Sequence, residues 1–185
     1  MPKINNIKGR QVFDSRGIPT IETEISLDDG TKASAIVPSG ASTGSHEAFE
    51  LRDSDNEKYL GKSVFKAIKK INGEISKALN GHSIEDQKQI DKTLIELDGT
   101  KQKKRLGGNT ILSVSLSACK AAAISKKIPL YKNIGKEKTL PLPLMNIING
   151  GVHADNSLRI QEFMIRPDKA KNFKEAINVC FLIIQ

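Results

Sequence analysis

The stretch Thr20–Gly30, TIETEISLDDG, decides how the first part of this 185-residue chain folds. Over 20–27 apolar or β-branched residues alternate with polar ones, which is the period of a strand with one buried face. The DDG that follows is a hairpin signal, because glycine adopts the left-handed backbone that tight turns need. Segments of similar character lie on both sides, at 4–13 and 32–37. The sequence therefore predicts three strands at the start of the fold.

Three helical patterns follow the strands. Over 62–79 apolar residues recur at helical spacing, and an Asn-Gly pair ends the pattern. A second helix is predicted after the capping sequence SIED at 83–86. The third, 109–126, has small side chains on almost every face, which allows a helix to pack closely on a sheet. Strands followed by helices predict an α+β domain over residues 1–135.

A polar connection at 132–139 separates this domain from the end of the chain. Apolar strand patterns return at 142–148 and 160–165, and a helix begins near Lys169. Its apolar end has no capping residue. Two strands and part of a helix are too little for an independent core, so 136–185 is expected to open a larger domain. We therefore expect the chain to be a piece of a longer protein.

The composition excludes several classes of protein. Charged residues make up 27% and hydrophobic residues 38%, which is typical of a folded soluble protein. Neither a membrane span nor a signal peptide is expected, so the predicted location is cytoplasmic. Cys119 and Cys180 lie far apart and are expected to be buried free thiols. The net charge of +8 comes from dispersed lysines, and aromatic residues total 4%, so nucleic-acid binding is not expected.

Three segments could carry chemistry. The first, VPSGASTG at 37–44, combines a freely moving backbone with three hydroxyl groups, which suits either a surface loop or a ligand-binding lid. In the second, NGGVHADN at 149–156, His153 lies on a glycine-rich loop directly after a predicted strand. This position suits either a catalytic histidine or an ordinary surface histidine. In the third, Glu162 stands beside Gln161 at an apolar strand. That carboxylate must be hydrogen-bonded or functional, because burying it unpaired is costly.

Taken together and in order, these segments closely resemble the enolase family. The matching pieces are Phe13–Thr20 (FDSRGIPT), Val37–Gly44 (VPSGASTG), Leu106–Asn109 (LGGN), Asn149–Gly151 with His153, and Gln161–Ile165 (QEFMI). Each piece is modestly specific, whereas five in order with the expected separations are very specific. The likeness covers the chain from about residue 3 to about residue 178, and the GVHADN form at 151–156 resembles bacterial members.

The resemblance implies a three-stranded antiparallel α+β capping domain, then the first elements of a modified TIM-type α/β barrel, here truncated. It implies a glycolytic lyase, phosphopyruvate hydratase, which reversibly dehydrates 2-phospho-D-glycerate to phosphoenolpyruvate. Two Mg²⁺ ions per active site are also implied, because removing a proton beside a carboxylate requires concentrated positive charge. A homodimer or octamer is implied, and secretion or cell-surface display is an alternative to a purely cytoplasmic location.

The resemblance also implies a mobile lid, which is carried over onto Ser39, Gly40, Ala41, Ser42 and Thr43. Ser42 resembles the lid serine whose oxygens reach the second Mg²⁺ when the lid closes. Ala41 resembles the lid backbone on the substrate side.

Further site residues are implied near the end of the chain. His153 and Glu162 resemble catalytic residues, His153 facing the substrate phosphate and hydroxyl region and Glu162 lying near the leaving hydroxyl. Gln161 lines the substrate site together with them. Arg16 and Glu22 resemble residues near the family's dimer contact.

The base lysine, the carboxylates of the first Mg²⁺ site, the proton-donor glutamate and the phosphate-binding groups lie, in the family, beyond the point where this chain ends. The 185-residue chain is therefore expected to be inactive alone. Two other hypotheses remain. The chain could be a genuine short product that docks on another protein through its apolar helix end, or a nucleic-acid binder with salt-sensitive retention.

Overall fold

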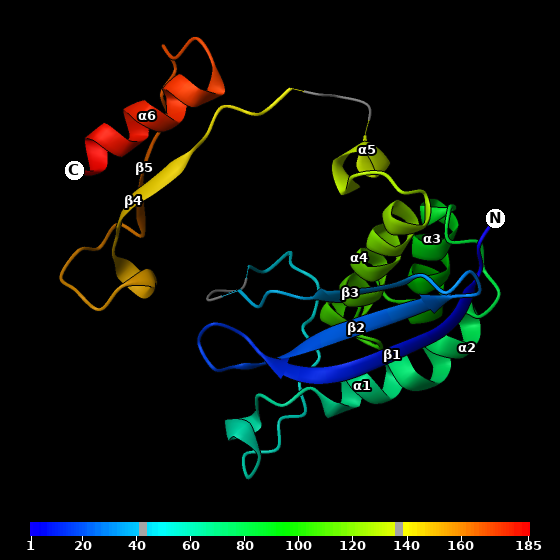
Figure 1. Cartoon of the computed structure of the whole chain (residues 1–185). Helices are drawn as coiled ribbons and strands as arrows, with labels where there is room; N and C mark the ends of the chain where they lie inside the picture. Colours follow the sequence, from blue (N-terminus) through cyan, green and yellow to red (C-terminus); the bar gives the residue numbers. More distant parts are fainter. Residues whose placement is uncertain (41–43, 136–138) are drawn as a thin grey trace. The chain divides into compact units, whose positions relative to one another are not determined.

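The computed structural model describes residues 1–40, 44–135 and 139–185. The chain divides into two compact units, Met1–Lys136 and Glu137–Gln185, and each is described by itself (Figure 1). No helix among the described residues is both long enough and apolar enough to cross a membrane.

The first unit opens with a three-stranded antiparallel sheet in the order β1-β2-β3. Its strands are β1 (Ile4–Phe13), β2 (Pro19–Leu27) and β3 (Lys32–Ile36). The predicted strands are thus confirmed, although the third ends one residue early. Val37 nevertheless continues the pairing, because its backbone N–H donates to the Ile21 carbonyl at 3.0 Å.

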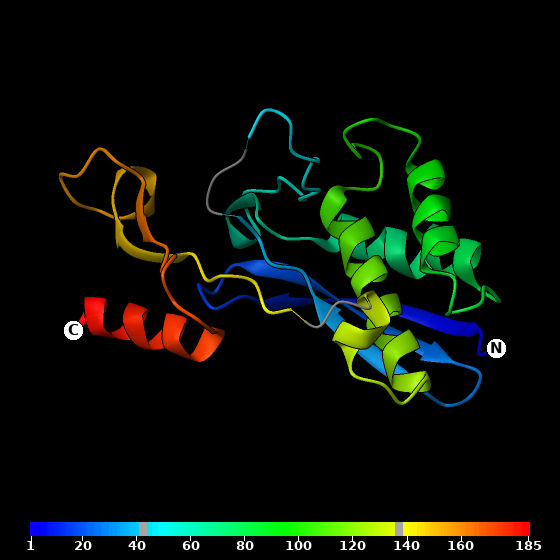
Figure 2. The ribbon, with the colours of Figure 1, turned by 90° about the horizontal axis from the view of Figure 1, so that it is seen from above.

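The helical elements of this unit follow the sheet along the chain. They are the 3₁₀ turn η1 (Tyr59–Gly61), α1 (Phe65–Lys70), the π-helical turn η2 (Ile71–Ile75), α2 (Ser76–Leu79), α3 (Gln87–Asp98), α4 (Gly108–Ser125) and α5 (Leu130–Ile134). Figures 1 and 2 show α4 across β2 and β3, whereas α1, η2 and α2 run beside β1. Helices α3 and α5 pack on other helices.

Helix α4 confirms the prediction from its small side chains. Ser113, Ser117, Ala118 and Ala121 are buried. The Ser117 hydroxyl donates to the Thr23 carbonyl on β2 at 2.7 Å, and the hydroxyls of Thr23 and Ser113 lie 2.8 Å apart. Larger residues could not bring the helix this close to the strand. The α4–β2 contact therefore fixes how the helical layer sits on the sheet.

Two predicted helix starts move in the structure. The first helix begins at Phe65 instead of residue 62, because both Asp53 carboxylate oxygens accept backbone N–H groups of its first turn at 2.8 Å. The second begins at Gln87, where Asp86 accepts the Gln89 N–H at 3.0 Å. The predicted cap at Ser83 is wrong, because Ser83 forms a bridge with Lys3 beside the sheet instead.

The π-helical turn η2 has a clear role at the edge of the sheet. It aims Asn72 at Gly9 of β1: the Gly9 N–H donates to Asn72 Oδ1 at 2.7 Å, and Asn72 Nδ2 donates to the Gly9 carbonyl at 3.2 Å. A Cβ on Gly9 would lie 3.0 Å from Ile71. Glycine at this position therefore allows the helix and the strand to approach closely.

Asp98 closes the loop between α3 and α4. The residue is 2% exposed, and its carboxylate accepts hydrogen bonds from the backbone N–H of Leu106 at 2.7 Å and from the backbone N–H and hydroxyl of Thr100. Burial raises the pKa of Asp98, but the hydrogen bonds from Thr100 and Leu106 outweigh it, so the pKa lies below its usual value. The ionised form therefore stabilises the fold.

We expect Asp98→Asn to lower the free energy of unfolding by about 1–3 kcal/mol at pH 7, because an amide cannot accept all of these donors. Because the pKa of Asp98 is lower in the folded than in the unfolded protein, its ionised form contributes its full stabilisation above the unfolded-state pKa. That stabilisation is lost as the pH falls through the folded-state pKa. The difference between the two proteins should therefore shrink in acid. Denaturant unfolding at pH 7 and at successively lower pH measures it, and a gap that widens in acid would contradict this account.

The second unit is a hairpin followed by a helix. Strands β4 (Met145–Asn149) and β5 (Glu162–Ile165) pair antiparallel, with the turn η3 (Gly151–His153) between them, and α6 (Phe173–Ile184) follows. The antiparallel pairing agrees with the predicted barrel start. Both strands begin two or three residues later than predicted. Helix α6 also begins later than predicted, at Phe173, because Asn172 caps it and accepts the Glu175 N–H at 2.9 Å.

The two cysteines are both free. Cys180 is buried in α6, as predicted, but Cys119 is only partly buried. Its partial exposure corrects the prediction of two buried thiols. Cys119 lies on α4 where the short helix α5 covers it incompletely; Asn133 of α5 donates to its carbonyl at 3.2 Å.

Candidate functional site

The β4–β5 hairpin brings together three residues that the sequence singled out. Glu162 begins β5 opposite Asn149, the last residue of β4. His153 ends the turn η3, and its Nδ1 lies 2.9 Å from Glu162 Oε1. On the other side of the imidazole ring, Nε2 lies 2.7 Å from Gln161 Nε2. The imidazole therefore lies between a carboxylate and an amide from adjacent positions of the chain.

The glycine pair at 150–151 makes this arrangement possible. The Gly150 N–H donates to the Gln161 carbonyl at 3.0 Å, and a Cβ on Gly150 would lie 2.5 Å from the Ile160 carbonyl oxygen. Only a residue without a side chain lets the two backbones approach this closely. The His153 N–H then donates to the Gly150 carbonyl at 3.0 Å, which directs the turn toward Glu162.

His153 and Glu162 are paired with each other, but both side chains remain partly accessible to solvent. Their side chains are 21% and 31% exposed. The carboxylate at the start of an apolar strand thus has a hydrogen-bond partner, which satisfies its polar oxygen. A ligand could reach all three side chains, so the cluster could bind a hydroxyl or an anionic group and exchange a proton with it.

The described residues do not form a metal site. In the ranges 1–40, 44–135 and 139–185, no three His, Cys, Asp or Glu side chains are grouped so that they could hold a metal ion. The predicted lid residues Ala41, Ser42 and Thr43 lie outside the described residues. Ser39 and Gly40 are described, and both line a cavity of about 540 Å³ beside α3 and α4.

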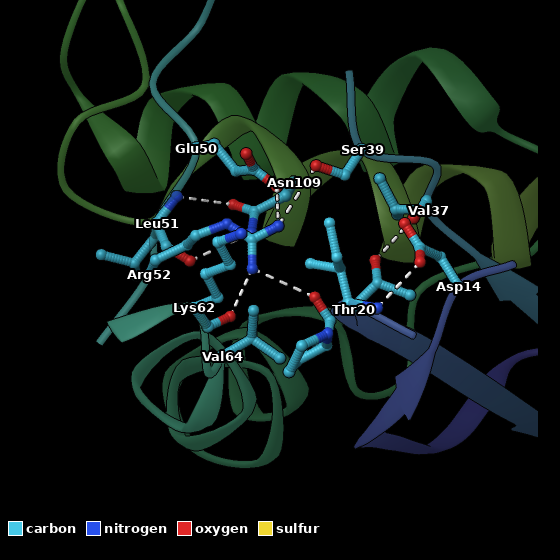
Figure 3. Close-up of polar contacts among 12 residues, drawn as sticks. Asp14, Thr20, Val37, Ser39, Glu50, Leu51, Arg52, Lys62, Val64 and Asn109 are labelled. Carbon is cyan, nitrogen blue, oxygen red and sulfur yellow. Dashed lines mark hydrogen bonds and ion pairs between the residues drawn. The ribbon is translucent and has the colours of Figure 1, made fainter. Parts of the chain in front are cut away.

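Ser39 is anchored by two guanidinium groups. Arg52 Nη2 donates to the Ser39 hydroxyl at 3.2 Å and to Glu50 Oε1 at 2.8 Å, as Figure 3 shows. From another side, Arg16 Nη2 donates to the Ser39 carbonyl at 2.8 Å while pairing with Asp14 at 3.0 Å. Ser39, the first residue of the predicted lid, is therefore held in place at this point.

Further hydrogen bonds fix the chain on both sides of the predicted lid (Figure 3). Before it, the Thr20 hydroxyl donates to the Val37 carbonyl at 2.6 Å. After it, Asn109 exchanges two hydrogen bonds with the backbone of Leu51, at 2.9 and 3.1 Å. Arg52 also donates to the carbonyls of Pro19 and Lys62. Four segments therefore meet around one guanidinium.

The sequence reasoning overlooked Arg52. Its only signal is a dense group of charges, Glu50, Arg52 and Asp53, in a stretch without helix or strand periodicity. Such a group must satisfy its charges through tertiary contacts, which a pattern cannot reveal. Arg16 and Glu22 were predicted near a dimer contact. Within the chain, Arg16 contacts Asp14 and Ser39, and Glu22 lies 3.3 Å from Arg10.

Comparison with known proteins identifies relatives for both units. The family described as "Enolase, N-terminal domain" matches residues 4–134, and "Enolase, C-terminal TIM barrel domain" matches residues 137–184. The enolase of Pelagibacter ubique (strain HTCC1062) is 60% identical over 186 aligned residues. That alignment covers 100% of this chain and 44% of the relative, so the chain spans less than half of the relative's length.

Proposed function

Because the chain belongs to the enolase family, we propose that the whole protein catalyses the reversible dehydration of 2-phospho-D-glycerate to phosphoenolpyruvate in glycolysis. The observation that supports this most directly is the cluster of His153, Gln161 and Glu162 on a glycine-shaped turn. It combines groups that can contact a phosphate, orient a substrate and interact with a leaving hydroxyl.

Each residue of the cluster has a proposed role. Glu162 contacts the C3 hydroxyl and assists its departure, since a carboxyl group can accept or supply a proton there. His153 faces the phosphate and hydroxyl region, and its pairing with Glu162 at 2.9 Å keeps the two groups in a fixed relation. Gln161, bound to the other imidazole nitrogen, lines the same surface and completes the contact with substrate.

The proposed reaction also requires positive charge beside the substrate carboxylate, and bound Mg²⁺ would supply it. The residues that the structure describes do not provide a ligand set for such an ion. We therefore expect the rest of the whole protein to carry the first site. Ser42 remains the proposed ligand of the second Mg²⁺.

The setting of the enzyme is part of the same proposal. We expect a cytoplasmic enzyme that assembles as a homodimer or octamer and has no role in nucleic-acid binding. Arg16 and Glu22 remain the proposed neighbours of the dimer contact.

A chimera tests the proposed function. The 185 residues are joined to the remaining, carboxy-terminal part of the Pelagibacter enolase. We expect the chimera to convert 2-phosphoglycerate to phosphoenolpyruvate in the presence of Mg²⁺, and the 185-residue chain alone to show no turnover. The intact Pelagibacter enolase is the matched control. A folded chimera without turnover would refute the family activity for this chain, and turnover by the chain alone would refute its dependence on the missing part.

A further inference from the structure

We propose that Glu162 holds the proton of neutral His153 on Nδ1, so that His153 gains protons and contacts ligands only through Nε2, where Gln161 is an exchangeable partner. This assigns Glu162 a positioning role in addition to its proposed contact with the leaving hydroxyl. The assignment of the proton stands on the geometry of the three side chains, and its consequence for catalysis rests on the proposed function.

The position of the proton follows from the partner of Nδ1. An ionised carboxylate is an acceptor only, and Glu162 Oε1 lies 2.9 Å from His153 Nδ1. Were Nδ1 bare, two acceptors would face each other across a hydrogen-bond distance. While Glu162 is ionised, Nδ1 must therefore carry a proton, both in the neutral ring and in the imidazolium. A free histidine in water instead favours the proton on Nε2, so Glu162 reverses the ordinary preference.

Nε2 is then the only ring atom whose proton can come and go. Gln161 Nε2 lies 2.7 Å from it, and as placed the amide donates to a bare ring nitrogen. Turning the amide by half a rotation presents its carbonyl oxygen, which would accept an Nε2–H of the imidazolium. Gln161 can therefore keep one hydrogen bond in both charge states of the ring, which no acceptor-only or donor-only side chain can do.

This arrangement has a consequence for anion binding. A phosphate group needs a donor, and neutral His153 offers none at Nε2 because its one proton points at Glu162. An anion must therefore displace Gln161 and meet the ring as an imidazolium, whose charge Glu162 balances from behind. Glu162 thereby determines which ring atom faces the ligand and in which charge state the contact forms.

Nitrogen NMR on the full 185-residue chain tests the proposal without substrate or turnover. The chain has only three histidines, so ¹⁵N-histidine labelling gives three pairs of ring signals, one Nδ1 and one Nε2 for each residue, and His153→Gln assigns the relevant pair. We expect Nδ1 of neutral His153 to show the protonated signal and Nε2 the unprotonated one. An Nε2–H form, or an equal mixture of both forms, would overturn the proposal.

Two variants separate the roles of the partners. Glu162→Leu removes the acceptor, and we expect the Nε2–H form to become the majority. Gln161→Met removes only the amide, and we expect the Nδ1–H form to persist. The signals of His46 and His82 should not move in either variant. An Nδ1–H form that survives Glu162→Leu would refute the positioning role of Glu162.

Inorganic phosphate is the probe for the ligand contact. We expect its addition to the wild-type chain to increase the protonated fraction of Nε2, and to do so less in Glu162→Leu. No change with phosphate would refute the ligand contact at Nε2. Because neither readout depends on catalysis, an inactive chimera would count against the proposed function and leave the proton assignment standing.

Discussion

Glu162→Gln in the chimera is expected to lower kcat by about 100- to 10,000-fold, the range typical of a lost acid–base group. The amide can neither take nor supply a proton at the leaving hydroxyl. It also replaces the charged partner that lies 2.9 Å from His153 Nδ1. Steady-state kinetics at saturating Mg²⁺ and 2-phosphoglycerate measure the change.

A matched control lies on the same loop. Asp155 is exposed, and Asp155→Asn removes one carboxylate near the cluster at no cost to the three side chains that form it. We expect its kcat to stay within about a factor of two, since a solvent-exposed charge is screened. If Glu162→Gln kept a kcat close to that of the control, Glu162 would have no part in the chemical step.

The largest expected effect on stability comes from Gly107→Ala. Gly107 is buried directly before α4 and has a φ of +94°, a value that residues with a side chain rarely adopt. A Cβ there would lie 2.5 Å from Leu51 Cβ and 2.7 Å from Asn109 Oδ1. Backbone strain and overpacking together are expected to lower the free energy of unfolding by about 2–6 kcal/mol. Small domains are stable by only about 5–15 kcal/mol, so this loss is a large fraction of the total free energy of unfolding.

Gly99→Ala separates strain from overpacking. Gly99 also has a positive φ, +70°, as the cap of α3, but the nearest atom to an added Cβ is the Glu96 carbonyl oxygen at 3.7 Å. We therefore expect Gly99→Ala to lower the free energy of unfolding by about 1–2 kcal/mol, which is the cost of the backbone conformation alone. Denaturant unfolding of the 185-residue chain, followed by circular dichroism, measures both variants. Equal losses would show that the contact with Leu51 does not matter.

Sequence patterns correctly predicted the strands and helices that are determined by residues close together in the chain. The alternation over Thr20–Leu27 reports directly which side chains face the core, and the small residues of α4 report close packing. The starts of α1 and α3 could not be read in this way. Asp53 caps α1 from 12 residues before Phe65, and apolar spacing does not distinguish the π-helical turn at Ile71–Ile75 from an ordinary helical turn.

The candidate site was predictable by residue type but not by contact. His153, Gln161 and Glu162 stood out because of a glycine-rich loop and a carboxylate in an apolar strand. Their meeting depends on how closely the backbone near Ile160 approaches Gly150, which is a tertiary distance. Arg52 carried no comparable signal, because all its partners except Glu50 are distant in sequence.

The engagement of Gly9 by Asn72 also bears on aggregation. At Gly9 on the β1 edge of the sheet, the backbone N–H and carbonyl are both already hydrogen-bonded to Asn72, so a strand from another molecule cannot pair with them. The opposite margin, β3, has five residues and begins with Lys32, whose charge opposes stacking of further strands. Growth of this sheet into a fibril is therefore hindered at Gly9 on the β1 edge and discouraged by Lys32 on the β3 edge.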